Sequence, residues 1–172
     1  MILLEDTRNV VGKHSLKHKW FEENGIELRR TKLYCGDYTL PTNQSVCIDT
    51  KQNLLELCGN VCGKEHARFR RECERAQEAG IKLIILVENR GGEIGKTGIS
   101  NPTIRNLSEL HSWKNPRLFI RRNGKQLYPS ATRGITLQKA CMTMEKKYSC
   151  RFLFTTPEES GEMIVKLLTQ NM

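Results

Sequence analysis

The segment I-K-L-I-I-L-V, residues 81–87, is the most apolar stretch of the chain and limits what the chain can fold into. A membrane span needs about 20 apolar residues, so this run is too short to cross a bilayer. A short apolar run bounded by polar residues instead fits a strand that is buried on both faces. The segment therefore predicts the central strand of a sheet covered by helices on both sides.

The segments around this strand alternate between strand and helix patterns. Further strands are expected at residues 2–4, 26–33, 37–40, 46–50, 117–120 and 151–154. Helices are expected at residues 13–24, 54–61, 65–79, 103–112, 136–148 and 157–168, and in the first of them Leu16, Trp20 and Phe21 share the inward face. The polar, Gly-rich residues 89–102 predict a mobile loop. This order indicates an α/β domain with a central mixed β-sheet flanked by helices.

The length of 172 residues suits one domain. We expect residues 1–172 to form it, with the core motifs in 2–90, a loop or insert over about 89–130, and a C-terminal helix-strand-helix unit in 133–170. Seven scattered cysteines indicate reduced thiols in an intracellular, cytoplasmic protein rather than a secreted disulfide framework. No apolar run is long enough for a membrane, and the early charges at Glu5 and Asp6 argue against a signal peptide.

The net charge of the chain indicates which kind of partner it binds. Lys and Arg number 28 against 19 Asp and Glu, a formal net charge of +9, which favours a polyanion such as nucleic acid over a small-molecule substrate. Two clusters stand out, although basic proteins that bind no DNA are common. They are Arg68, Arg70, Arg71 and Arg75, and Arg117, Arg121, Arg122 and Lys125.

The stretch Y-C-G-D-Y-T-L-P-T-N-Q-S-V-C-I-D-T-K, residues 34–51, places acids on a predicted hairpin, where Asp is unfavourable. The turn is centred near Asn43, so Asp37 and Asp49 become cross-strand neighbours. Alternation along the second strand puts Asp49 and Lys51 on one face. Two close carboxylates repel each other unless a cation lies between them, and Mg²⁺ takes such oxygen ligands.

Lys51 and Asp6 extend this hypothesis. A lysine beside a metal can orient or deprotonate a water, or stabilise charge on a phosphate. Asp6 ends the first strand and could add a ligand. A solvated hairpin with an Asp–Lys pair is the simpler interpretation of the D-T-K tripeptide alone.

The motifs Asp6-Thr7-Arg8-Asn9, Gly36-Asp37-Tyr38 and Asp49-Thr50-Lys51 resemble those of XPF-type nuclease domains in the PD-(D/E)xK, restriction-endonuclease-like superfamily. The family shows D-x-R-E, a G-D-Y-like motif and E-R-K. The C-terminal R-F-L-F-T-T-P-E-E-S-G-E is also similar to the family's strand, proline and helix. The chain looks like a stand-alone domain of the kind that phages and prophages carry.

The resemblance implies a restriction-endonuclease-like fold and hydrolysis of DNA phosphodiesters with Mg²⁺ or Mn²⁺. It assigns Asp37 and Asp49 as catalytic metal ligands, Lys51 as the catalytic lysine and Asp6 as a further metal-binding acid. XPF-type nucleases often pair through this domain, so a homodimer is also implied. A structure-specific endonuclease of DNA repair, recombination or phage DNA processing fits the resemblance, in the host cytoplasm or at the nucleoid.

The chain departs from the family pattern at several positions. Asn9 replaces the acid of D-x-R-E, and Asp49-Thr50 replaces Glu-Arg. Leu55 stands where the family has its last acid, with Glu56 one residue later. These departures keep open a non-catalytic DNA-binding module on the same fold.

Other signals allow further hypotheses. Residues 91–97, G-G-E-I-G-K-T, partly match a phosphate-binding loop, so nucleotide hydrolysis through Lys96 is a third alternative, although the first glycine is misplaced. Cys58, Cys62 and His66 recur at helical spacing, where buried thiols are a simpler interpretation than zinc. The basic helix at 65–79 is mostly a solvated face with one or two DNA contacts. The DNA-binding candidates are Arg8, His66, Arg68, Arg70, Lys96 and Arg121.

Overall fold

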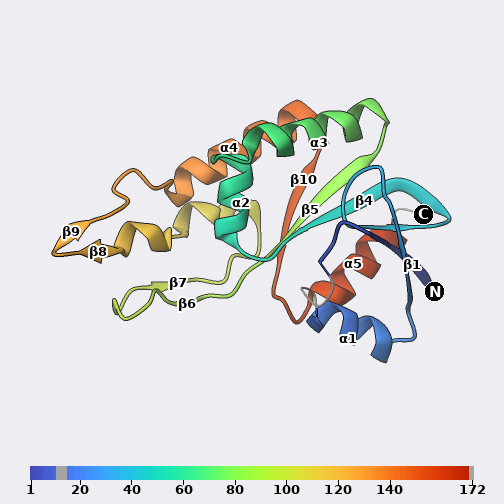
Figure 1. The fold of residues 1–172 in the computed structure, drawn as a ribbon, viewed down its shortest axis with the longest axis horizontal. Coiled ribbons are helices and arrows are strands. Elements are labelled where there is room, and N and C mark those ends of the chain that lie inside the picture. Colours follow the sequence, from blue (N-terminus) through green and yellow to red (C-terminus); the bar gives the residue numbers. More distant parts are fainter. Residues whose placement is uncertain (11–14, 171–172) are drawn as a thin grey trace.

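A six-stranded mixed sheet organises the molecule (Figure 1). The computed structural model describes residues 1–10 and 15–170. The strands lie in the order β10-β5-β4-β3-β1-β2. Pairing is antiparallel where β3 meets β1 and β4, and parallel between the other neighbours. The strands are β1 (Ile2–Asp6), β2 (Glu27–Thr31), β3 (Tyr38–Leu40), β4 (Asn43–Lys51), β5 (Lys82–Glu88) and β10 (Arg151–Thr155).

Helices cover both faces of this sheet, as the apolar run predicted. Strand β5 points Leu83, Ile85 and Val87 into one core cluster, and Ile84 and Leu86 into the other. Alternating side chains of a strand face opposite sides, so a strand buried on both sides must be apolar throughout. The first cluster lies under α2 (Leu54–Val61), α3 (His66–Glu78) and α4 (Gly134–Tyr148), and the second under α1 (Ser15–Glu23) and α5 (Ser160–Thr169). The expected α/β fold is confirmed.

The predicted hairpin is formed by β3 and β4. Tyr38 pairs with Ile48, the register in which Asp37 and Asp49 are opposite each other. At the turn end the register shifts, and Leu40 pairs with Asn43. The symmetric turn expected from the sequence was therefore wrong at the tip and correct at the end that bears the acids.

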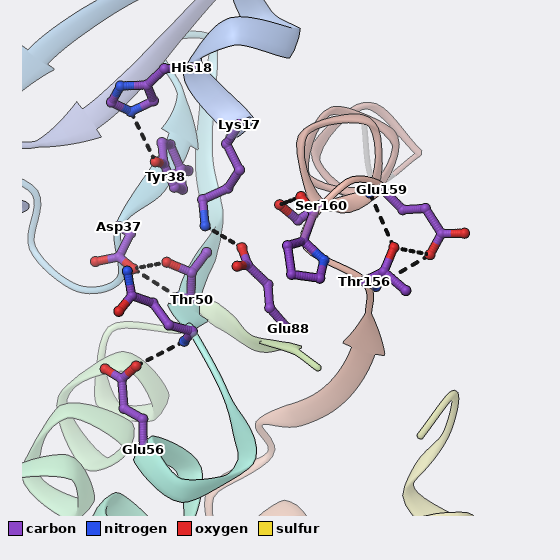
Figure 2. A network of polar contacts seen from close by, with 12 residues as sticks. Lys17, His18, Asp37, Tyr38, Thr50, Glu56, Glu88, Thr156, Glu159 and Ser160 are labelled. Atoms are coloured by element: carbon purple, nitrogen blue, oxygen red, sulfur yellow. Dashed lines mark hydrogen bonds and ion pairs between the residues drawn. The ribbon is translucent and has the colours of Figure 1, made fainter. Parts of the chain in front are cut away.

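The inward face of α1 differs from the prediction by one residue. Leu16 is half exposed, whereas Lys17 is buried and forms an ion pair with buried Glu88 at the end of β5 (Figure 2). A buried charge needs a partner, and Glu88 supplies it from the face of the sheet that α1 covers. Phe21, four residues on, is fully buried. The other end of the predicted helix, residues 13 and 14, lies outside the described residues.

Residues 89–133 carry short elements that sequence patterns placed poorly. The predicted loop at 89–102 holds a small hairpin, β6 (Gly92–Glu93) and β7 (Ser100–Asn101). The strand expected at 117–120 was wrong, because Asn115 caps and Pro116 begins a 3-10 helix, η2 (Pro116–Phe119). Ahead of it lies another 3-10 helix, η1 (Leu107–Ser112), and after it the hairpin of β8 (Arg121–Arg122) and β9 (Lys125–Gln126). Within the described residues, no helix is long and apolar enough to span a bilayer.

Candidate active site

The sequence contains three aspartates, Asp6, Asp37 and Asp49, and the fold brings all three to one cavity of about 190 Å³. Asp6 ends β1, Asp37 precedes β3, and Asp49 lies near the end of β4. The peptide N–H of Asp6 donates to the carbonyl of Asp37 at 2.8 Å, and that of Asp37 to Ile48 at 2.7 Å. The cavity is lined by Asp6, Arg8, Asn9, Gly36, Asp37, Asp49, Thr50, Lys51, Glu56, Arg68 and Glu72.

Gly36 makes the close approach of these strands geometrically allowed. Its φ of +70° lies in the left-handed region that favours glycine. A Cβ atom there would lie 3.0 Å from the carbonyl oxygen of Ile48 and 3.1 Å from Cβ of Cys47. The Gly-Asp pair of the motif thus turns the chain so that Asp37 faces β4.

The Asp37 carboxylate is oriented by Thr50. Its Oδ2 accepts hydrogen bonds from the Thr50 hydroxyl at 2.6 Å and the Thr50 peptide N–H at 2.8 Å (Figure 2). Burial raises the pKa of Asp37, although the Thr50 hydrogen bonds and the Lys51 charge oppose that rise.

Asp49 and Lys51 form a buried ion pair at the end of β4. Lys51 Nζ lies 2.6 Å from Asp49 Oδ2, so the ammonium is the partner of this buried oxygen. Burial raises the pKa of Asp49 to about 6, and Asp37 contributes to the rise while Lys51 opposes it. Burial lowers the pKa of Lys51, but the attraction of Asp49 outweighs that cost and the net shift is upward. Lys51 Nζ also lies 5.0 Å from the centre of the Phe69 ring.

Asp6 holds Arg8 rather than an open coordination position. Its Oδ1 accepts from the peptide N–H and the Nε of Arg8, both at 2.7 Å. Its Oδ2 accepts from an Arg8 terminal nitrogen at 2.8 Å and from the Leu33 peptide N–H at 2.9 Å. Burial raises the pKa of Asp6, but the hydrogen bonds from Arg8 and Leu33 lower it further, so the net shift is downward. Direct binding of a cation would require Asp6 to release Arg8.

Glu72 of α3 is a cavity residue that the sequence reasoning missed. Its Oε1 accepts from the Gly36 peptide N–H at 3.0 Å, which ties α3 to the Gly-Asp turn. Burial raises the pKa of Glu72, and nearby Asp49 raises it further. Its position three residues after buried Phe69 on the same helix was the available signal. Glu56 also lines the cavity, whereas Leu55 is 36% exposed and lines neighbouring hollows instead.

The donor set of the cavity fits a hard divalent cation. Mg²⁺ is usually held by one or two carboxylates together with water and phosphate oxygens. Asp37 and Asp49 both line the cavity and meet this need. In residues 1–10 and 15–170, no three Asp, Glu, His or Cys side chains group closely enough to hold a metal by themselves.

The structure separates the DNA-binding candidates into two groups. Arg8 and Arg68 line the cavity. His66 does not; it is half-buried, with an Nδ1 that lacks a hydrogen bond in the described structure. Arg70 pairs with Glu74 at 3.5 Å on the helix surface. Lys96 and Arg121 belong to the β6–β7 turn and the β8 strand, away from the cavity lining.

The phosphate-loop alternative is wrong. A P-loop requires a helix that begins at its lysine. Residues 91–97 instead enter the β6–β7 hairpin, and Lys96 lies in its turn. The next helical segment, η1, begins at Leu107.

Comparisons with known protein families and solved structures identify similar proteins. The model of the ERCC4 domain family matches residues 6–167. XPF from Aeropyrum pernix matches with a TM-score of 0.62 and 16% identity, covering 99% of this chain and 65% of that one. XPF from Aeropyrum pernix in complex with DNA matches with a TM-score of 0.60 and 16% identity, covering 99% of this chain and 64% of that one. This chain therefore spans less than two thirds of either protein. No curated protein sequence matches it.

Proposed function

The chain belongs to the ERCC4 domain family, and from that membership we propose that it hydrolyses DNA phosphodiesters with a divalent cation, Mg²⁺ or Mn²⁺. The observation that carries the proposal is the Asp49 carboxylate. It is buried opposite Asp37 and paired with Lys51. Asp37 and Asp49 repel each other, and a cation bound between them would remove that repulsion.

Asp37 and Asp49 would hold the cation. When bound, it would supply Lewis-acid stabilisation of the negative charge that develops on the phosphate. Thr50 hydrogen-bonds Oδ2 of Asp37 and so fixes the orientation of this carboxylate in the cavity. Asp6, predicted as a further ligand, we propose to act through Arg8, because its oxygens already accept from that side chain and from Leu33.

Lys51 and Arg8 would act on the phosphate. Asp49 keeps Lys51 protonated, so it serves as a donor and a positive charge rather than as a base. Arg8 is held by Asp6 while more than half of its side chain stays exposed, which leaves its guanidinium able to contact a phosphate. Both cations stabilise charge that increases as the phosphorus is attacked.

Glu72 is placed to take the proton in the hydrolysis. Water adds its oxygen to phosphorus, one P–O ester bond breaks, and one water proton must leave. Glu72 is anchored through Oε1 and has a pKa raised by burial and Asp49, both of which suit a general base. The departing sugar oxygen takes a proton from solvent.

The test is cleavage of labelled single-stranded, duplex, flap, fork and four-way-junction DNA with Mg²⁺ or Mn²⁺. Asp49→Asn preserves shape and removes the charge, and Glu162→Gln, on the exposed surface of α5, is the matched control. We expect metal-dependent cleavage in the wild type and the control and none in Asp49→Asn. Cleavage that persists in Asp49→Asn would contradict the proposal.

Binding of DNA without cleavage at any metal would favour the non-catalytic module. Two copies pairing through this domain, and a role in repair, recombination or phage DNA processing inside the cell, stay predictions. Light scattering of the purified protein tests the first.

A further inference from the structure

Most of the net positive charge of the protein lies in one part of the chain. Residues 89–133, here named the basic arm, contain nine Lys and Arg against two Glu, a net charge of +7. The other 127 residues contain 19 basic against 17 acidic residues, a net charge of +2. The arm therefore supplies most of the +9 of the whole chain with about a quarter of its length.

Ion pairing neutralises little of this charge. Arg90 pairs with Glu158 and Arg105 with Glu159, and both pairs tie the arm to the residues ahead of α5. In the described structure the other basic residues of the arm have no acidic partner. They are Lys96, Lys114, Arg117, Arg121, Arg122, Lys125 and Arg133.

The β8–β9 hairpin gathers three of these cations at its tip. Asn123 and Gly124, with φ of 50° and 76°, form the two-residue turn. Positive φ at both central positions is typical of a type I′ turn. Arg122 pairs directly with Lys125, and Arg121 with Gln126. Like charges placed opposite each other destabilise a β-ribbon, so this pairing costs stability in the absence of an anion.

The base of the same hairpin is apolar. The Leu127 peptide N–H donates to the Ile120 carbonyl at 3.0 Å, which continues the ladder by one pair. Ile120 and Leu127 are 43% and 44% exposed and fall on the same face as Arg122 and Lys125. A ribbon with cations at its tip and apolar side chains behind them resembles a surface for a large anionic partner rather than a solvated turn.

The hairpin lies at one end of the long axis of the molecule, beyond α2 as seen from the sheet (Figure 1). Residues at its base, including Tyr128, line a hollow together with Leu55 and Cys58 of α2. Glu56 of the same helix lines the catalytic cavity. The base of the hairpin and the catalytic cavity therefore both border α2, and DNA that spans the two would pass this helix.

We propose that the β8–β9 hairpin is a basic β-ribbon that grips double-stranded DNA beyond α2, outside the catalytic cavity. The major groove admits a two-stranded β-ribbon, and phosphates on its edges would neutralise Arg121, Arg122 and Lys125. The identity of the partner rests on the proposed function, because DNA held at the cavity continues toward the hairpin. The charge, pairing and placement of the ribbon are independent of catalysis.

The test measures binding in EDTA, where no cleavage occurs. Fluorescence anisotropy compares the wild type with Arg121→Ala/Arg122→Ala/Lys125→Ala on duplexes from half a turn to two turns long, over a series of salt concentrations. The matched control, Lys139→Ala/Lys146→Ala/Lys166→Ala, removes three exposed cations from α4 and α5. Arg121→Lys/Arg122→Lys keeps the charge, and thermal melting verifies that each variant folds.

Wild-type affinity should increase once the duplex is long enough to reach from the cavity to the hairpin. The triple hairpin variant should lose this increase and reduce the slope of log K against log salt by about 0.9 for each lost phosphate contact, about 2.7 at most. The control and the lysine variant should keep most of the length-dependent increase in affinity and most of the salt dependence. An unchanged hairpin variant, an equal loss in the control, or a wild type that binds no duplex would overturn the proposal.

These outcomes separate the two proposals. Cleavage by the wild type with an unaltered hairpin variant would reject the ribbon and leave the nuclease. Hairpin-dependent binding by a protein that cleaves no DNA would reject the nuclease and support the ribbon.

Discussion

The catalytic cavity and the basic arm are both rich in charge and hold it in opposite ways. In the cavity, Asp49 faces Lys51 and Asp6 faces Arg8, and both acids are buried. In the arm, Arg122 lies opposite Lys125 and both are exposed. Burial makes an unpaired charge costly, so the cavity must pair its ions, whereas water screens those of the arm. Charges that take part in a reaction must be held in position by partners. Charges that only attract DNA over a distance can stay exposed and unpaired.

The largest effect should come from removing the Asp49 charge. Asp49→Asn should lower the cleavage rate by more than about 10³-fold, because several kcal/mol of charge stabilisation depend on the bound cation. Rates at saturating Mg²⁺ on a duplex substrate give the measurement. In EDTA the same variant should bind DNA at least as well as the wild type. A loss of binding in EDTA would show that the cavity and the arm are not separable in this way.

Removing Lys51 from its ion pair with Asp49 should destabilise the fold. Lys51→Met leaves Asp49 buried without its cation, and we expect a loss of about 3 kcal/mol at pH 8. Urea unfolding in EDTA measures this, and the double variant Lys51→Met/Asp49→Asn should recover much of it. A single variant as stable as the wild type would mean that water already solvates the pair.

A substitution of Glu72 tests whether this residue is the general base. Glu72→Gln should lower the cleavage rate by about 10²-fold or more, because proton transfer by a positioned side chain is worth that much. Gln also accepts from the Gly36 N–H, so the turn is preserved. Divalent-cation affinity, followed by Mn²⁺ binding, should change little. A loss of cation affinity equal to that in Asp49→Asn would make Glu72 a ligand instead.

Stability should depend on pH through Asp49. Its pKa is about 6 in the folded protein against an ordinary value of 3.8, so between these values the folded state binds more protons than the unfolded state. Its contribution to stability is therefore present below about pH 4 and is lost as pH rises through about 6, by roughly 2–3 kcal/mol. Urea unfolding at pH 4.5 and 7.5 in EDTA should show this loss in the wild type relative to Asp49→Asn. Equal pH dependence in both proteins would place the titration elsewhere.

The smallest predicted effect is a gain in stability rather than a loss. Arg122→Thr removes one member of the like-charged pair in the β8–β9 hairpin and should raise stability by roughly 0.3 kcal/mol. Thermal melting at low salt measures it, and the gain should shrink at high salt. A clear loss of stability would show that Arg122 has a structural role, unlike the other exposed cations of the arm.

Local patterns predicted the elements whose signals are strong. The run at 81–87 became β5, residues 54–61 became α2 within its expected bounds, and the acid-bearing end of the β3–β4 hairpin has the expected register. The strand at 117–120 failed because Asn115 and Pro116 start a 3-10 helix, a choice made by two residues ahead of the segment. The face of α1 failed because Glu88, far along the chain, gives Lys17 a buried partner.

By itself the sequence determined the α/β order, the hairpin that carries Asp37, Asp49 and Lys51, and the excess of basic residues in 89–133. These follow from neighbouring residues, since periodicity, turn chemistry and composition are local. Only the tertiary structure decided that Glu72 joins the cavity, that Asp6 accepts hydrogen bonds from Arg8 and Leu33, and that the β8–β9 hairpin lies at one end of the molecule. The reason is physical: hydrogen bonds, burial and ion pairs join residues that are distant in sequence, and those contacts exist only once the sheet and its helices have packed.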